Sequence, residues 1–256
     1  MWNPNQYQKF ASERDRPFFD LLTRVQKPNA RTVADLGCGT GSLTAMLAQK
    51  FPNATIIGVD SSAQMLEKSA GFQNPKLEFV LADLSSWQPK KPLDVIVSNA
   101  ALQWLEDHET LIPNLAALLE PDGILAVQMP INFEQPSHTI LRDLTDSESW
   151  KPHLRAFSST LRAPKPAVWY VELLSSLGFT VDAWETTYHH VLQGENAVLE
   201  WVKGTALRPV LKALEPERQA SFLEELGAQY LEVYPTQAFG TMFAFNRLFF
   251  VARRTA

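Results

Sequence analysis

The stretch VADLGCGTGSLT, residues 33–44, joins an apolar run to a glycine-rich turn and then to a helix-forming segment. Glycines stand at every second position from Gly37 to Gly41, and Asp35 precedes the first of them by two residues. Glycine permits a sharp backbone turn and the close approach of a ligand. The stretch therefore predicts a strand, a ligand-binding turn and a helix in succession.

Strand and helix patterns alternate on both sides of this stretch. We expect strands at residues 32–36, 54–60, 77–83, 93–99, 123–129, 179–192 and 245–254. Helical patterns separate most of them, at residues 14–25, 42–51, 62–72, 108–120 and 167–177. Continuously apolar strands that alternate with helices are typical of a parallel sheet covered on both faces. The sequence thus predicts an α/β fold with a doubly wound, mostly parallel, Rossmann-like seven-stranded sheet, in one domain spanning residues 1–256.

Two largely helical segments, at about 130–165 and 195–240, interrupt this regular frame. The first contains four prolines between short helical fragments, and the second ends in a long helical pattern at 218–234. In open α/β sheets, ligands bind at the carboxyl ends of the strands. Long insertions commonly build the wall or lid of such a site. We therefore expect both segments to form a cap over the substrate.

Composition excludes several classes of function. The chain has 23 basic and 28 acidic side chains and a net charge of −5, which gives no electrostatic footprint for long nucleic acid. The single cysteine, Cys38, excludes an intramolecular disulfide. No segment has the pattern of a signal peptide or a membrane span, and no residues have metal-ligand spacing. We expect a cytoplasmic protein without metal, membrane or nucleic-acid partners, as a monomer or weak homodimer.

The acids around the glycine turn indicate what it binds. The turn reads G-x-G-x-G, which departs from the dinucleotide fingerprint G-x-G-x-x-G. Asp35 would repel a pyrophosphate but attract a cation. Asp60, nineteen residues after Gly41, stands where a carboxylate can accept from both ribose hydroxyls. Asp83 ends the third predicted strand and could accept from an adenine amino group. The pattern favours a cationic ligand that carries ribose and adenine over a polyphosphate.

The segments VADLGCGTGS, GVDSS and LADL resemble the S-adenosylmethionine-binding frame of class I methyltransferases. The resemblance implies S-adenosyl-L-methionine as cofactor and S-adenosyl-L-homocysteine as product. It places Asp35 near the amino-acid end of the cofactor, Asp60 on the ribose and Met65 against the adenine. The implied cofactor-binding residues are Asp35, Gly37, Cys38, Gly39, Gly41, Asp60, Ser61, Met65, Asp83, Leu84 and Asn99.

The whole chain is similar to the trans-aconitate 2-methyltransferases. The similar stretches include NAALQWLEDH at 99–108, GILAVQMP at 123–130, TTYHH at 186–190 and RLFFVARR at 247–254. The resemblance implies methyl esterification of one carboxylate of trans-aconitate. LQW is also similar in methylases of malonyl thioesters, so methylation of another small acid stays open, as does a non-catalytic module that binds the cofactor. A nicotinamide oxidoreductase is disfavoured by the glycine spacing.

Esterification of a carboxylate makes few demands on the protein. A carboxylate is already ionised at neutral pH, since its reference pKa is about 4, so no general base and no catalytic acid–base residue is expected. A polyacid does need cations, and arginine pairs carboxylates through two parallel hydrogen bonds. Strand alternation places His189 on one face, and Tyr188 with His190 on the other. The expected substrate-binding residues are Arg208, Arg14, Arg16, Arg247, Trp104, Tyr188 and His189.

Overall fold

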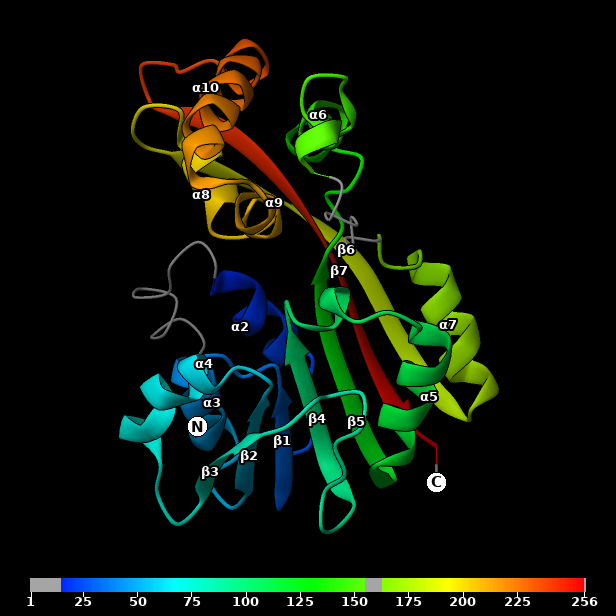
Figure 1. Ribbon diagram of the computed structural model, residues 1–256. Coiled ribbons are helices and arrows are strands. Elements are labelled where there is room, and N and C mark those ends of the chain that lie inside the picture. Colours follow the sequence, from blue (N-terminus) through cyan, green and yellow to red (C-terminus); the bar gives the residue numbers. More distant parts are fainter. Residues whose placement is uncertain (1–14, 155–162, 256) are drawn as a thin grey trace. The chain divides into compact units, whose positions relative to one another are not determined.

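A seven-stranded sheet in the order β3-β2-β1-β4-β5-β7-β6 organises the computed structural model, which describes residues 15–154 and 163–255 (Figure 1). The strands are β1 (Thr32–Leu36), β2 (Thr55–Asp60), β3 (Leu77–Leu81), β4 (Leu93–Asn99), β5 (Leu119–Pro130), β6 (Phe179–Leu192) and β7 (Thr241–Arg254). The five strands from β3 to β5 in this order all pair in parallel. The predicted mostly parallel seven-stranded sheet is confirmed.

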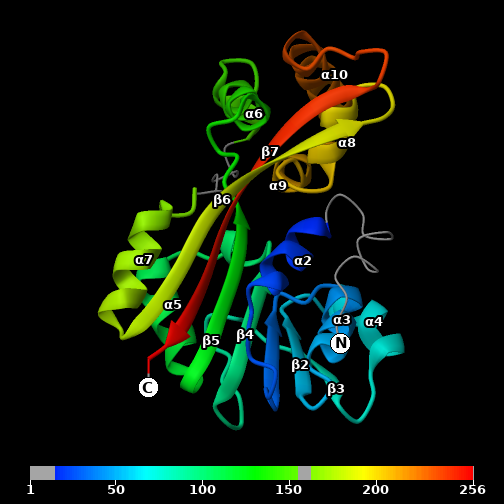
Figure 2. The ribbon, with the colours of Figure 1, turned by 180° about the vertical axis from the view of Figure 1, so that it is seen from behind.

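Strand β7 runs against its neighbours. The N–H of Thr255 donates to the carbonyl of Gly178 at 2.9 Å, and nearer the other end the Thr187 hydroxyl donates to Asn246 Oδ1, also at 2.9 Å. Residue numbers therefore fall along β7 while they rise along β6, which is the pattern of an antiparallel pair. The arrows of β5 and β7 point in opposite directions in Figures 1 and 2, so β7 is also antiparallel to β5.

Helices cover both faces of the sheet. Comparison of Figures 1 and 2 places α5 and α2 over opposite faces. The helices are α2 (Arg16–Thr23), α3 (Ser42–Lys50), α4 (Ala63–Ser69), α5 (His108–Ala117), α6 (Pro136–Asp146), α7 (Ala167–Ser176), α8 (Ala197–Lys203), α9 (Arg208–Ala213) and α10 (Pro216–Val233). Short 3-10 turns are η1 (Ala70–Phe72), η2 (Leu102–Trp104) and η3 (Lys151–His153). Ser62 caps α4, since its hydroxyl accepts from the N–H of Met65 at 3.3 Å.

The described residues form two compact units. The second unit is drawn from Pro130–Ala163 and Thr187–Arg247, and the first from the rest. The second unit contains α6, α8, α9 and α10 together with the outer parts of β6 and β7, and aromatic side chains such as Phe222 and Phe243 fill its core. Strand β7 begins at Thr241, four residues before the predicted start, because the turn closed at Gly240 lets pairing resume at once.

The loops after β1 and β4 approach each other closely at Gly37, which explains why this position is a glycine. A Cβ added to Gly37 would lie 2.1 Å from the Cβ of Ala101, in the loop that follows β4. Gly37 also has a φ of +81°, which side-chain-bearing residues rarely adopt. Gly41 is confined in another way, since an added Cβ would lie 2.6 Å from the Phe79 ring. The loops after β1 and β4 can touch only because residue 37 has no side chain.

We expect Gly37→Ala to lower the free energy of unfolding much more than Gly39→Ala does. Both positions have positive φ, so each alanine adds backbone strain of about 1–3 kcal/mol. Only Gly37→Ala adds a clash, because nothing lies within 4 Å of a Cβ added to Gly39. Urea unfolding of the two variants measures the difference. Equal losses would contradict the role given to the Ala101 contact.

Candidate functional site

The glycine turn after β1 is fastened to the end of β2 by backbone hydrogen bonds. The carbonyl of Val59 accepts from the N–H groups of Gly37 and Cys38, at 2.8 and 3.1 Å. The N–H of Gly39 donates to Asp60 Oδ2 at 2.8 Å. The turn is therefore shaped by its neighbour strand before any ligand arrives.

Asp60 joins two loops through one carboxylate. While Oδ2 accepts from Gly39, Oδ1 accepts from the N–H of Ser62 at 2.8 Å, just before α4. Each carboxylate oxygen has two lone pairs, so one acceptor position on each remains for further donors such as ribose hydroxyls. The side chain is half-buried. Its structural role was missed by the sequence analysis, which assigned Asp60 to the ligand alone.

Asp35 is a buried carboxyl beside this pair of loops. Its side chain is 3% exposed, and its Oδ2 accepts from the Thr44 hydroxyl at 2.6 Å. Burial raises the pKa of Asp35 to about 6, the charge of Asp60 adds to the rise, and the Thr44 hydrogen bond opposes it. Near neutral pH, Asp35 therefore presents a poorly solvated negative charge that favours a nearby cation.

The thiol of Cys38 is not activated. Burial raises its pKa far above the ordinary value, and the charges of Asp35 and Asp60 add to the effect. The thiol therefore stays protonated at neutral pH, whereas a nucleophilic cysteine needs a lowered pKa. Cys38 has the character of a small, buried residue within the turn.

The remaining predicted cofactor residues follow β2 and β3. Met65 is half-buried in the first turn of α4, whereas Ser61 is exposed. Leu84 is buried, and its Cδ1 lies 3.9 Å from a Cβ built on Gly37. Asp83 is exposed, and its Oδ1 accepts from the N–H and hydroxyl of Ser85 at 2.8 and 2.7 Å. These hydrogen bonds lower the pKa of Asp83 and hold the loop after β3 in a tight turn.

The segment after β4, residues 100–105, forms the next loop at the same edge of the sheet and is strained. Ala100 has a φ of +54°, a conformation that costs about 1–3 kcal/mol for a residue other than glycine. Its carbonyl accepts from Gln103 Nε2 at 2.7 Å. The side-chain oxygens of Asn99 and Gln103 are buried and have no hydrogen-bond partner among the residues that the structure describes. Unsatisfied oxygens of this kind are suited to a donor on a ligand.

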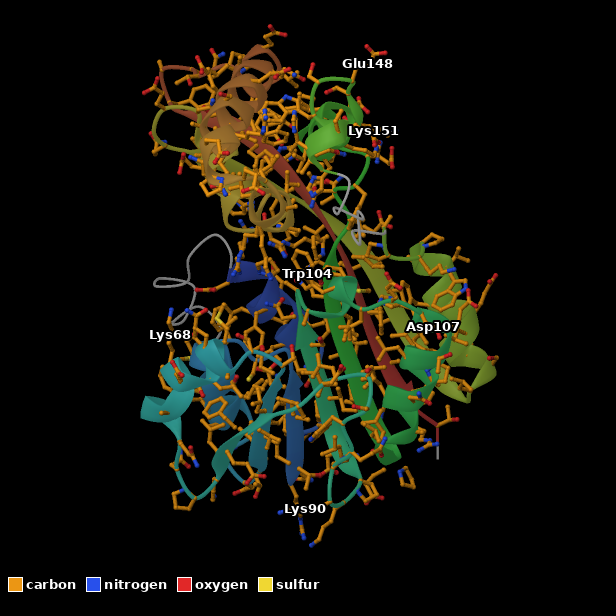
Figure 3. The ribbon with its side chains drawn as sticks, in the orientation of Figure 1. Lys68, Lys90, Trp104, Asp107, Glu148 and Lys151 are labelled. Atoms are coloured by element: carbon orange, nitrogen blue, oxygen red, sulfur yellow. The ribbon has the colours of Figure 1, made fainter. Side chains whose placement is uncertain are left out.

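Trp104 is the last residue of the η2 turn in this segment and lies at the carboxyl ends of the strands. Figure 3 shows it at the edge of the sheet opposite Lys90, and 47% of its surface is exposed. The sequence predicts Asn99 and Trp104 as site residues but not Ala101 or Gln103. Both lie within the quoted stretch NAALQWLEDH, yet only the fold shows that Ala101 meets Gly37.

The acceptors gathered here fit a cationic nucleoside. Asp35 and Asp60 form no ion pair within residues 15–154 and 163–255, so their charges are offset by hydrogen bonds alone. The loops after β1, β2, β3 and β4 supply them from adjacent parallel strands. A phosphate would meet carboxylates at this edge, whereas an ammonium or sulfonium group would be stabilised.

Most of the predicted substrate-binding residues lie in the second unit. Arg208 is exposed at the first position of α9. Arg247 is buried, with its guanidinium carbon 4.7 Å from the Phe245 ring centroid and 6.0 Å from that of Tyr188. His189 is exposed, whereas Tyr188 and His190 are buried. This confirms the predicted alternation along β6.

Two further arginines, Arg14 and Arg16, were predicted to bind the substrate. Arg16 opens α2 and is exposed, with its Nε 4.0 Å from Asp20. Arg14 lies outside the described residues. Across residues 15–154 and 163–255, no group of three or more histidine, cysteine or acidic side chains could hold a metal ion. Nor does any helix in those ranges have the length and apolarity needed to cross a membrane.

Comparison with known proteins supplies the family. A methyltransferase domain model matches residues 33–123, from β1 into β5. A trans-aconitate 2-methyltransferase of Streptomyces avermitilis is 44% identical over 266 residues, covering 100% of this chain and 97% of that relative.

Solved structures agree on the fold. The YcgJ protein of Bacillus subtilis has a TM-score of 0.61 at 15% identity, covering 93% of this chain and 97% of that one. A phosphoethanolamine N-methyltransferase of Haemonchus contortus, solved with S-adenosylhomocysteine, has a TM-score of 0.54 at 16% identity, covering 94% of this chain and 53% of that one. These similarities show the class I methyltransferase fold, while the full-length identity shows the family. The chain belongs to the trans-aconitate 2-methyltransferase family.

Proposed function

We propose that this protein transfers a methyl group from S-adenosyl-L-methionine to one carboxylate of trans-aconitate, releasing S-adenosyl-L-homocysteine. The observation that carries the proposal is the 44% identity to the Streptomyces avermitilis trans-aconitate 2-methyltransferase, which runs through both predicted insertions as well as the cofactor frame. Buried Asp35 in β1 and half-buried Asp60 at the end of β2 support a cationic cofactor independently.

The loops after β1 to β4 would hold the cofactor. Asp35 would attract its positive charge, the free lone pairs of Asp60 would accept from the ribose, and Met65 would pack on the adenine. Asn99 supplies a buried acceptor that is still without a donor in the described chain. S-adenosyl-L-methionine, when bound, supplies a methyl group on a sulfonium sulfur.

The protein's contribution to the reaction is orientation. The acid substrate is ionised at neutral pH and needs no proton removed. Its carboxylate oxygen must be held in line with the methyl group at about 3 Å, and such positioning alone can supply 7–11 kcal/mol of the barrier reduction. Arginines are the suited anchors for the remaining carboxylates. Arg208 and Arg247 are the proposed anchors in the second unit, with Tyr188, His189 and Trp104 as further contacts.

A methyl-transfer assay with labelled S-adenosyl-L-methionine tests the proposal. The acceptor panel is trans-aconitate, cis-aconitate, isocitrate, citrate and a malonyl thioester, and the expected result is selective labelling of trans-aconitate as a base-labile ester. Selective labelling of the malonyl thioester would move the substrate to another small acid. Binding of S-adenosyl-L-homocysteine without transfer to any acid would contradict the enzymatic proposal.

We expect the titration of Asp35 to affect cofactor binding and protein stability in opposite directions as the pH changes. Its native pKa of about 6 exceeds the ordinary 3.8, so the folded protein binds this proton more tightly than the unfolded chain does. Stability of the ligand-free protein should therefore fall as pH rises from about 4 to 6, by a total of about 3 kcal/mol. Affinity for S-adenosyl-L-homocysteine, which carries an ammonium group, should instead fall as pH drops below about 6, by up to about tenfold per pH unit.

The variant Asp35→Asn separates the two effects, because the amide oxygen can still accept from Thr44. We expect it to raise the free energy of unfolding at pH 8 and to bind S-adenosyl-L-homocysteine weakly at every pH. Calorimetric titrations between pH 5 and 8, with denaturant unfolding at the same pH values, measure both. An affinity as high as that of the wild type at pH 8 would exclude the proposed role of the charge.

Arg208→Ala should raise the KM for trans-aconitate by about 10–100-fold, the usual effect of losing a charged hydrogen bond. Its S-adenosyl-L-homocysteine affinity should stay within twofold of the wild type. Lys212→Ala is the matched control, because Lys212 is an exposed cation on the same helix. Similar KM values in the two variants would show that Arg208 does not bind the acid.

A further inference from the structure

A buried histidine holds the strained segment that follows β4. His108, the first residue of α5, is 7% exposed, and its Nε2 lies 2.9 Å from the carbonyl oxygen of Leu102. Its Nδ1 lies 2.6 Å from the Tyr170 hydroxyl. A carbonyl only accepts, so Nε2 carries the proton and Nδ1 accepts from the tyrosine. Both ring nitrogens are occupied within the protein.

The far side of the imidazole is fixed by α7. Tyr170 is fully buried, and its ring stacks on Phe250 of β7 with centroids 5.0 Å apart. Its hydroxyl also accepts from the N–H of Lys165 at 3.3 Å. These contacts restrict the movement of Tyr170. The hydrogen bond from Tyr170 in turn restricts the orientation of the His108 ring.

Within the described chain, Nε2 of His108 is the one side-chain donor from outside residues 100–105 that reaches a carbonyl of this segment. The same Leu102 carbonyl also accepts from the N–H of Leu105 at 3.0 Å, and the N–H of Ala100 donates to the carbonyl of Gln128 at 2.9 Å. Ala100 is in a left-handed conformation, and the Gln103 side chain bonds only within the segment. Leu102 lies between Ala101, which meets the glycine turn, and Gln103, whose buried oxygen has no partner among the described residues. The Gln128 bond holds the start of the segment, and the His108 bond holds its middle at Leu102, next to both of these neighbours.

We propose that His108 is a positioning residue for the methyl-transfer reaction: it fixes the loop of residues 100–105 through the Leu102 carbonyl, and thereby the wall of the site that carries Gln103 and Trp104. This inference rests on the proposed function for its catalytic consequence. A role as general base is excluded by geometry, because both nitrogens are engaged and the ring is buried. The hydrogen bond to Tyr170 orients the imidazole ring, and the hydrogen bond to the Leu102 carbonyl holds the loop.

Two conservative substitutions separate the two hydrogen bonds. The amide of asparagine reaches about as far as Nδ1, so His108→Asn keeps a partner for Tyr170 and loses Leu102. The longer glutamine places its amide near Nε2, so His108→Gln keeps the bond to Leu102 and loses Tyr170. Tyr170→Phe is the matched control, since it removes one hydroxyl from the same core and leaves the Leu102 bond intact.

We expect His108→Asn to lower kcat for trans-aconitate at least tenfold, since small misplacements of a reacting group are costly. His108→Gln and Tyr170→Phe should keep kcat within about threefold, even where their Tm falls. The dissociation constant for S-adenosyl-L-homocysteine should change less than twofold in all three variants. A kcat that follows Tm across the three, with His108→Asn no worse than the others at equal Tm, would overturn the positioning role.

Amide hydrogen exchange of the ligand-free protein distinguishes this inference from the proposed function. A peptide covering residues 100–105 should exchange at least tenfold faster in His108→Asn than in the wild type, and at an unchanged rate in the other two variants. The exchange rate does not depend on which acid is methylated. It therefore tests whether His108 fixes residues 100–105 even if the wild-type protein methylates none of the acids in the assay. Unchanged exchange in His108→Asn would overturn the inference outright.

Discussion

The carboxylate of Asp60 is the interaction on which the site depends. It is the common acceptor for the loop after β1, through Gly39, and for the loop before α4, through Ser62. A parallel sheet brings such loops to one edge but does not by itself fix their backbones. A single side chain that accepts from both converts two turns into one rigid surface. Each oxygen of the same carboxylate keeps one further acceptor position, held in place by these bonds.

That surface is built at an electrostatic cost. Asp35 is buried close enough to Asp60 for the second charge to raise its pKa further, and only the Thr44 hydroxyl offsets the burial. Strain of another kind lies in the left-handed Ala100 beside it. Functional sites commonly hold such unfavourable arrangements, which a ligand of the right charge and shape can relieve. A sulfonium or ammonium group is the complement that two crowded carboxylates call for.

The sequence predicted the frame because strands such as 32–36, 93–99 and 179–192 each have a glycine or proline at one boundary, namely Gly37, Pro92 and Gly178. It also predicted which acids follow the strands. It could not predict that Asp60 accepts from backbone N–H groups, or that Gly37 must clear Ala101, because those contacts join segments far apart in the chain. The His108–Tyr170 bond spans 62 residues and leaves no periodic signal. The exposure of Arg208 and the burial of Arg247 likewise depend on packing within the second unit.

A nucleophile that is ionised before it binds changes what the protein must supply. Where a proton has to be moved, a site is recognised by a group whose pKa lies near the working pH and which can reach the substrate. Here the raised pKa belongs to Asp35, which is buried and bonded to Thr44, and the role that we propose for its charge is attraction of the cofactor. Rate enhancement must then come from geometry, which depends on the anchors that contact the substrate and also on the groups that hold the walls of the site in place. The bonds that hold residues 37–39 and 100–105 in place are therefore as much a part of the chemistry as the residues that line the site.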